Sequence, residues 1–384
     1  MDITIGYVCG VNPFEDRFSW SGLHYKIREA IENAGFKVVW IQYRLSSPSI
    51  LFWEKVRWRL YGLFGKKIFL GGVHYLPEVV CYANSIRKDE NFKKCDFLFF
   101  PGGAQISLFL GCKKPIIYYT DATAHIMVDY YWKNCNHLSA KMACYLEKRA
   151  SLKACINIRA SKWAIRSVIN DCGCDASNCK VLEFGATIDE KDIVPSNMSF
   201  DGELLNVLFS GVDWERKGGD IAVQTITQLR QNGINAVLNI VGIKELPDYC
   251  QEKGYIINHG FLNKNDHESY VKYIQLYKSN HIFLLPTKAE CAGIVFSEAA
   301  GFGLPSYTYA TGGTENYVLN GVNGYALSEN AVASDFANRI IEDLKNGNLF
   351  VLRENAIKLY HNKLSWNSWS NRFSAIMNDV PHLK

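Results

Sequence analysis

The sequence has no long hydrophobic run and no pair of cysteines at the CxxC spacing. No apolar stretch among its 384 residues approaches the roughly 18 to 20 residues needed to cross a bilayer. The first residues form no basic segment, and Glu15 and Asp16 follow early, so we expect a β-strand there rather than a signal peptide. The twelve cysteines contain no CxxC pair, so we expect no metal site and interpret them as reduced thiols of a cytoplasmic protein.

Tandem repeats and low-complexity tracts are also missing. The composition, 48% hydrophobic and 21% charged, is that of a globular protein, and the length favours two domains. Charge is uneven: residues 1–200 contain 26 Lys plus Arg against 19 Asp plus Glu, whereas the remainder contains 16 against 19. The two halves are therefore expected to have different tasks.

The basic excess is greatest in residues 50–70, "ILFWEKVRWRLYGLFGKKIFL", where five basic residues and one acid alternate with aromatic side chains. This composition suits a helix lying on an anionic membrane surface, with cations at the headgroups. An amphipathic helix packed on its own domain, with a solvated basic face, explains it equally well. Nucleic acid is not expected as a partner, because no recognition module accompanies the patch.

Short apolar runs alternate with helical patterns along the whole chain, which is the signature of an α/β fold. The break between two such series falls in a polar, turn-rich segment, so we predict a linker at 186–204. The predicted strands are 2–8, 36–42, 96–100, 115–119, 155–158, 180–184, 206–210, 236–241, 255–258, 281–285 and 305–308.

Each half begins with a strand, a glycine-containing loop and a helix. In the first loop, Ser19 or Ser21 is positioned to cap a helix, and Gly22 would let an anion approach the helix amides. In the second loop, Arg216 and Lys217 precede a Gly-Gly pair and a helix. Arginine offers a fork of donors and lysine a point charge, a combination that suits a diphosphate.

Two glutamates, Glu290 and Glu298, flank a glycine and an apolar run. On one helix, eight residues at about 100° each would place them roughly 80° and 12 Å apart. With Glu290 in the loop after a strand and Glu298 in the following helix, both can line a cleft while the amides of Gly293, Ile294 and Val295 face an anion. Carboxylates accept bonds from hydroxyls and amides donate to phosphates, so the expected ligand is a sugar nucleotide.

Several motifs together resemble those of the retaining nucleotide-sugar glycosyltransferases of family 4. The resemblance covers about residues 15–340 and implies the GT-B architecture, in which two Rossmann-like domains face each other across a cleft. It implies an N-terminal acceptor domain at 1–190, a donor domain at 200–360 and a C-terminal helix at 361–384 that crosses back. The motifs are the E-x7-E pair at 290 and 298, "AGFGLP" at 300–305, "GGTENYV" at 312–318, "NG" at 323–324, "FSGVDWERKGG", "FGATID" and "HGFLNK" at 259–264.

The resemblance also implies residue roles in a transfer that needs no metal or other cofactor. Arg216 and Lys217 would hold the diphosphate, Glu298 the ribose and Glu290 the sugar. Glu290 could act as a transient nucleophile or only as a clamp on the sugar, and we favour the clamp. The implied donor-binding residues are Gly22, Gly211, Arg216, Lys217, Phe261, Leu262, Glu290, Gly293, Ile294, Val295 and Glu298, with Phe261 and Leu262 against the nucleobase. The donor, a UDP or GDP sugar, and a glycan or lipid-linked glycan acceptor are the expected partners.

The acceptor hydroxyl must lose a proton, and here the chain departs from the family pattern. Asp121 stands where the family often has a histidine, and His125 follows four residues later. We favour Asp121 as the base because it directly follows a strand; His125 would act if it lay one helical turn on. A nucleotide-sugar epimerase, a disaccharide phosphorylase and a non-catalytic sugar-nucleotide-binding subunit are the alternative functions.

Overall fold

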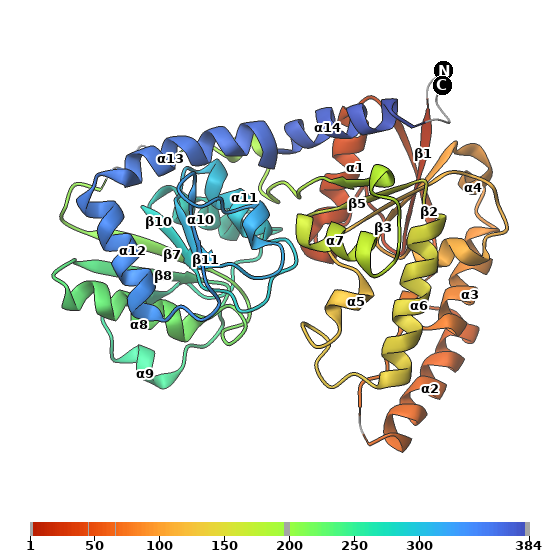
Figure 1. Cartoon of the computed structure of the whole chain (residues 1–384), viewed down its shortest axis with the longest axis horizontal. Coiled ribbons are helices and arrows are strands. Elements are labelled where there is room, and N and C mark those ends of the chain that lie inside the picture. The colour runs from red at the N-terminus through yellow and green to blue at the C-terminus, as the bar shows by residue number, and fades with distance from the viewer. Residues whose placement is uncertain (1–2, 45, 66, 196–199, 381–384) are drawn as a thin grey trace. The chain divides into compact units, whose positions relative to one another are not determined.

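The computed structural model describes residues 3–44, 46–65, 67–195 and 200–380 (Figure 1). Its chain divides into two compact units, one formed by Met1–Leu182 with Ser370–Lys384 and the other by Glu183–Trp369. Each unit is built on a six-stranded parallel sheet. The predicted α/β class with two Rossmann-like domains is therefore confirmed.

The first unit has the strand order β2-β1-β3-β4-β5-β6. Its central strands are buried along their whole length, as in "FLFFP" of β3 and "IIYYT" of β4, because helices cover both faces of a parallel sheet. The strands are β1 Thr4–Cys9, β2 Lys37–Gln42, β3 Phe97–Pro101, β4 Ile116–Thr120, β5 Ile156–Arg159 and β6 Cys179–Val181. The helices are α1 Leu23–Asn33, α2 Pro48–Leu63, α3 Leu76–Ile86, α4 Asn91–Lys94, α5 Ala124–Met127, α6 His137–Lys153 and α7 Lys162–Asn170.

The second unit has the strand order β12-β11-β10-β7-β8-β9. Its first strand, β7, lies between β8 and β10, so the strand order reverses there. The strands are β7 Leu205–Ser210, β8 Ala236–Val241, β9 Ile256–Asn258, β10 Ile282–Leu285, β11 Ser306–Tyr309 and β12 Gly324–Leu327. The helices are α8 Gly219–Gln231, α9 Asp248–Gln251, α10 His267–Lys278, α11 Ile294–Gly301, α12 Ala333–Lys345 and α13 Asn348–Leu359.

All eleven predicted strands are present in the described residues, and one more, β12, was missed. Asp2 at the start of the first predicted strand and 196–199 in the predicted linker lie outside the described residues. The last helix, α14 (Trp366–Asn378), begins in the second unit and ends in the first. Trp366 and Trp369 of this helix are buried. No helix in the described ranges combines the length and apolar character needed to cross a bilayer.

Candidate functional site

The predicted donor-binding residues follow two neighbouring strands of the second sheet. Strand β7 ends at Ser210 and its partner β10 ends at Leu285, so the segments after them leave the same edge of the sheet. The strand order reverses at this point, and open α/β sheets bind ligands where it does. The loops at 211–218 and 286–293 are therefore placed to form a site.

A glycine lets these two loops approach closely. Gly218 has a φ of +73°, and a Cβ atom there would lie 2.0 Å from the carbonyl oxygen of Pro286. Side chains rarely adopt such a φ, and none would fit against that oxygen. Gly218 is also the N-cap of α8, where it has no side chain with which to cap the amides that follow.

Two cations and a carboxylate come together beside this contact. The Lys217 ammonium donates a hydrogen bond to the Glu290 carboxylate, and Arg216 Nη1 lies 3.9 Å from the same oxygen. Arg216 also donates to the Ala289 carbonyl at 3.1 Å and lies 3.4 Å from the Asp213 carboxylate through its Nε. The Lys217 and Glu290 side chains are only 10% and 13% exposed, so the pair is shielded from water, while Arg216 is 26% exposed. The structure thus brings together three predicted residues from two separate loops.

The backbone around Glu290 is fixed by glycines. Gly293, with a φ of +89°, is the N-cap of α11, and a Cβ atom there would lie 2.5 Å from the Phe296 ring. Ile294 and Val295 follow it in the first turn of the helix and are half-buried. The Gly313 amide donates to the Glu290 carbonyl at 2.9 Å, so the segment after β11 holds this loop in place.

Glu298 is fully buried, and its carboxylate already has partners at both oxygens. Oε1 accepts from the Thr187 hydroxyl at 2.7 Å and the Lys264 ammonium at 3.0 Å. Oε2 accepts from the hydroxyls of Tyr273 at 2.8 Å and Tyr277 at 3.1 Å. Burial alone would raise the pKa of Glu298, but the charge of Lys264 and these hydrogen bonds hold it below its ordinary value. Its predicted contact with ribose stays a prediction, and a ribose hydroxyl would compete with Lys264.

Lys264 and Thr187 were not assigned roles from the sequence, although both lie in motifs that carried the resemblance. Lys264 is in "HGFLNK" and Thr187 in "FGATID". The Lys264 ammonium donates to the Thr187 hydroxyl at 2.7 Å as well as to Glu298. Burial lowers the pKa of Lys264, but the carboxylate of Glu298 more than offsets this and raises it. We call Thr187, Lys264, Tyr273, Tyr277 and Glu298 the carboxylate cluster.

The loop that carries Lys264 also presents the predicted nucleobase contacts. Gly260 accepts a hydrogen bond from the Gly242 amide at 2.8 Å, so the loop is held at one end by backbone and at the other by Lys264. Between these points Phe261 is 55% exposed and Leu262 is half-buried. An exposed ring on an anchored loop is suited to stacking, but its role stays a prediction. Gly211, after β7, is packed tightly, since a Cβ there would lie 2.9 Å from Lys217 Cγ.

In the first unit, the turn before α1 differs from the one predicted. The prediction that Ser19 or Ser21 caps α1 is wrong, because the N-cap is Gly22, with a φ of +83°. The Ser19 hydroxyl instead donates to the Asp16 carboxylate at 2.6 Å. Trp20 and Ser21 also have positive φ, at 51° and 57°. Glycine adopts a positive φ without strain, but Trp20 and Ser21 do not, and proteins tolerate such strain mainly at functional sites.

The two candidate bases lie at the carboxyl end of β4. Asp121 directly follows the strand and is half-buried, with the Thr120 hydroxyl donating to its carboxylate at 3.3 Å. His125 is not one helical turn from it, because Thr123 is extended and α5 begins only at Ala124. The His125 ring nitrogen Nδ1 is 3.9 Å from Cys172 Sγ, and burial lowers its pKa. The structure leaves the choice of base as a prediction.

In the described part of the chain, no group of three or more His, Cys, Asp or Glu residues is arranged to hold a metal ion. All twelve cysteines are free thiols.

Comparison with known proteins agrees with this geometry. Residues 192–359 match the family model described as "Glycosyl transferases group 1", a stretch that contains both loops of the site and the carboxylate cluster apart from Thr187. No curated protein matches the sequence.

Solved glycosyltransferases share the fold over nearly the whole chain at low identity. A sucrose-phosphate synthase from Thermosynechococcus elongatus is similar with a TM-score of 0.70 and 15% identity, covering 100% of both chains. A lipopolysaccharide outer core galactosyltransferase has a TM-score of 0.66 and 14% identity, covering 98% of this chain and 100% of that one. Anabaena HepE, in complex with UDP and glucose, has a TM-score of 0.64 and 15% identity, covering 98% of this chain and 100% of its own.

Proposed function

We propose that the protein is a retaining glycosyltransferase of family 4. It moves a hexose-type sugar from a nucleoside-diphosphate sugar to a hydroxyl of a glycan or lipid-linked glycan in polysaccharide or lipopolysaccharide assembly. One observation carries this proposal. Arg216 and Lys217 both lie against the Glu290 carboxylate at the point where the strand order reverses, inside the segment that matches the family model. The complex of HepE with UDP and glucose supports a sugar nucleotide as the donor class.

The mechanism follows from the charge that must be stabilised. Breaking the anomeric bond produces an oxocarbenium-like sugar and a departing diphosphate, so fixed positive charge on the leaving group lowers the barrier most. Arg216 and Lys217 provide that charge, so we propose that transfer needs no metal. A diphosphate would draw Lys217 away from Glu290, and the freed carboxylate would then accept hydrogen bonds from sugar hydroxyls.

On the acceptor side, we propose Asp121 as the base that takes the proton of the acceptor hydroxyl, with His125 as the alternative. Gly22 would contribute backbone amides to the donor phosphates. The proposal includes a cytoplasmic location and peripheral contact of residues 50–70 with an anionic membrane surface.

A donor panel tests the function. Incubation with UDP and GDP sugars should release nucleoside diphosphate slowly without acceptor and faster with one, in the presence of a chelator, and the product anomer should match that of the donor. A C2-inverted sugar would instead indicate an epimerase, and binding without turnover a sensor.

Arg216→Ala tests the assignment of the diphosphate. We expect it to slow turnover at least about a hundredfold, since single charge-stabilising donors contribute on that order. Arg166→Ala, at an exposed position outside the site, is the control. Unchanged turnover of the Arg216 variant would refute the assignment.

A further inference from the structure

Helix α2 exposes the side chains that a packed helix would cover. Among its residues, Pro48–Leu63, only Ile50 is buried. Seven residues between Leu51 and Leu63 are exposed, and at about 100° per residue they fall within an arc of about 140°. Four are large and apolar, namely Leu51, Phe52, Trp58 and Leu63, with exposures of 49%, 58%, 64% and 77%. The apolar face of this helix therefore points to solvent rather than to the core.

The exposed face also carries charge of one sign. Lys55 and Arg59 lie on it, and Lys67 is exposed just beyond the helix. The single acid, Glu54, is half-buried, so the described residues of 48–69 contain no exposed acid. Protein interfaces are depleted of lysine at their centres, whereas membrane-surface helices combine basic residues with tryptophan and leucine. The charge complementarity favours an anionic bilayer over a protein partner.

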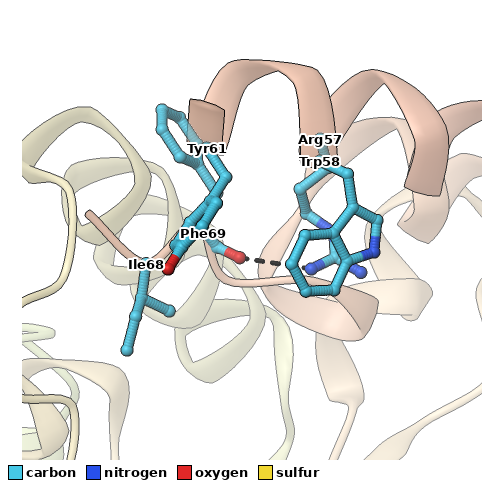
Figure 2. Close-up of a pocket in the computed structure, with 5 residues that line it drawn as sticks. All are labelled: Arg57, Trp58, Tyr61, Ile68 and Phe69. Carbon is cyan, nitrogen blue, oxygen red and sulfur yellow. Dashed lines mark hydrogen bonds between the residues drawn. The ribbon is translucent and has the colours of Figure 1, made fainter. Parts of the chain in front are cut away.

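At the edge of this face, where Trp58 lies, there is a small hollow, shown in Figure 2. Arg57, Trp58 and Tyr61 project from α2, and Ile68 and Phe69 from the segment opposite. The hollow has a volume of about 220 Å³. Four of its five lining residues are apolar or aromatic, so the walls suit a hydrocarbon.

The one charged wall residue is already neutralised. Arg57 donates to the carboxylate of Glu78 at 3.2 Å and to the carbonyl of Phe69 at 3.3 Å, as the dashed line in Figure 2 marks for Phe69. Glu78 is 1% exposed and accepts a further hydrogen bond from the Gly72 amide at 2.6 Å. The guanidinium therefore serves as a wall of the hollow, and its charge is not available to bind a phosphate.

We propose that this hollow holds one hydrocarbon chain of an anionic membrane lipid, while Lys55, Arg59 and Lys67 contact headgroups. The inference rests on the membrane contact within the proposed function and adds to it a chain-binding site. Since a cavity of about 150 Å³ accommodates benzene, a hollow of this size has room for roughly nine carbons. In this proposal the protein is anchored by one lipid chain drawn partly out of the bilayer into the hollow, in addition to the contact that the helix face makes.

A series of n-alkyl phosphates, used below their micelle concentrations, tests the chain site by calorimetry. Affinity should rise about fourfold for each methylene up to roughly nine carbons and then level off. Trp58→Ala should weaken binding of the longer chains at least about tenfold. Phe350→Ala, which removes a ring of 68% exposure in the second unit, is the matched control and should leave binding unchanged. The proposal would be overturned if the affinity for alkyl phosphates did not depend on chain length, or if Trp58→Ala left that affinity unchanged.

Flotation with phosphatidylglycerol vesicles tests the membrane contact separately from chain binding in the hollow. Replacing Lys55, Arg59 and Lys67 by glutamine should abolish salt-sensitive binding, whereas the same change at exposed Lys244, Lys345 and Lys358 should not. Vesicle binding without chain-length dependence would leave the membrane contact standing and refute the hollow. Binding only to a protein or to a second copy of the chain, seen as a dimer by light scattering, would overturn both. If no UDP or GDP sugar were turned over in the donor panel, the proposed transferase activity would be refuted, but the lipid-chain site would not be affected.

Discussion

Replacing Lys264 by methionine should destabilise the second unit through Glu298. Methionine keeps much of the length of the lysine side chain but removes its charge and the hydrogen bonds to Thr187 and Glu298. The carboxylate of Glu298 is fully buried and cannot turn to water. The variant would therefore contain a buried carboxylate without its cation.

The size of the effect follows from the burial of the two partners. Removing one partner of a buried ion pair costs about 3–5 kcal/mol. Because the Lys264 side chain is 33% exposed while that of Glu298 is 0% exposed, we expect a value near the lower end, about 3 kcal/mol. In urea this corresponds to a midpoint lowered by about 1 M or more.

The loss should depend on pH with a defined sign. In the wild type the pKa of Glu298 is lowered, so its paired carboxylate stabilises the fold above the ordinary pKa of 4.5, and this is lost as the pH falls through the lower folded pKa. Without Lys264, burial should raise the pKa above 4.5, so the variant loses stability as the pH rises past that value. The difference between the two proteins should therefore be larger at pH 7 than at pH 4.5.

Urea unfolding at both pH values, followed by circular dichroism, measures this difference. Lys94→Met is the control, because its partner Glu90 is exposed and such a surface pair contributes less than about 1 kcal/mol. Adding Glu298→Gln to Lys264→Met should recover stability by removing the unpaired charge. A loss below about 1 kcal/mol at pH 7, or one equal at both pH values, would contradict the reasoning.

Two further predictions concern the loop contact and the base. Gly218→Ala should lower the unfolding free energy by about 2 kcal/mol or more, because the new Cβ would meet the Pro286 carbonyl. Gly233→Ala, at a similar φ but in open space, is the control and should cost about 1 kcal/mol. Equal losses of the two variants in thermal unfolding would show that the contact with Pro286 does not matter. With a true acceptor, Asp121→Asn should reduce turnover at least about a hundredfold while His125→Ala stays near wild type, and the reverse pattern would make His125 the base.

The strands could be predicted because each is a short apolar run. Strands β3 and β4 are buried on both faces, so their sequences are continuous runs of apolar and aromatic residues, as expected in a parallel sheet covered by helices. β12 was missed because it begins with Gly324 and directly follows a turn at 321–323. Other strands of four or three residues were predicted, so the neighbouring turn residues, rather than its length, hide the local signal of β12.

The site was predictable only in part. The order of the motifs gave Arg216, Lys217 and Glu290 as neighbours of one ligand, but not the ion pair between Lys217 and Glu290. The carboxylate cluster joins residues 77 and 34 positions apart in sequence, so no local periodicity reports it. The wrong cap at α1 has a similar cause, since the left-handed backbone at Trp20 could not be foreseen from its side chain.

The position of β7 has a consequence for the order in which the second sheet forms during synthesis. β7 can pair with β8 as soon as residues up to Val241 are available, and β9 extends that edge. Its other edge stays open until the chain has been made as far as β10, because Val207 pairs with Ile282. Until then a largely apolar central strand behaves as an exposed edge, the kind that joins other chains. A ribosome stalled between β9 and β10 would thus hold this sheet at its most aggregation-prone length.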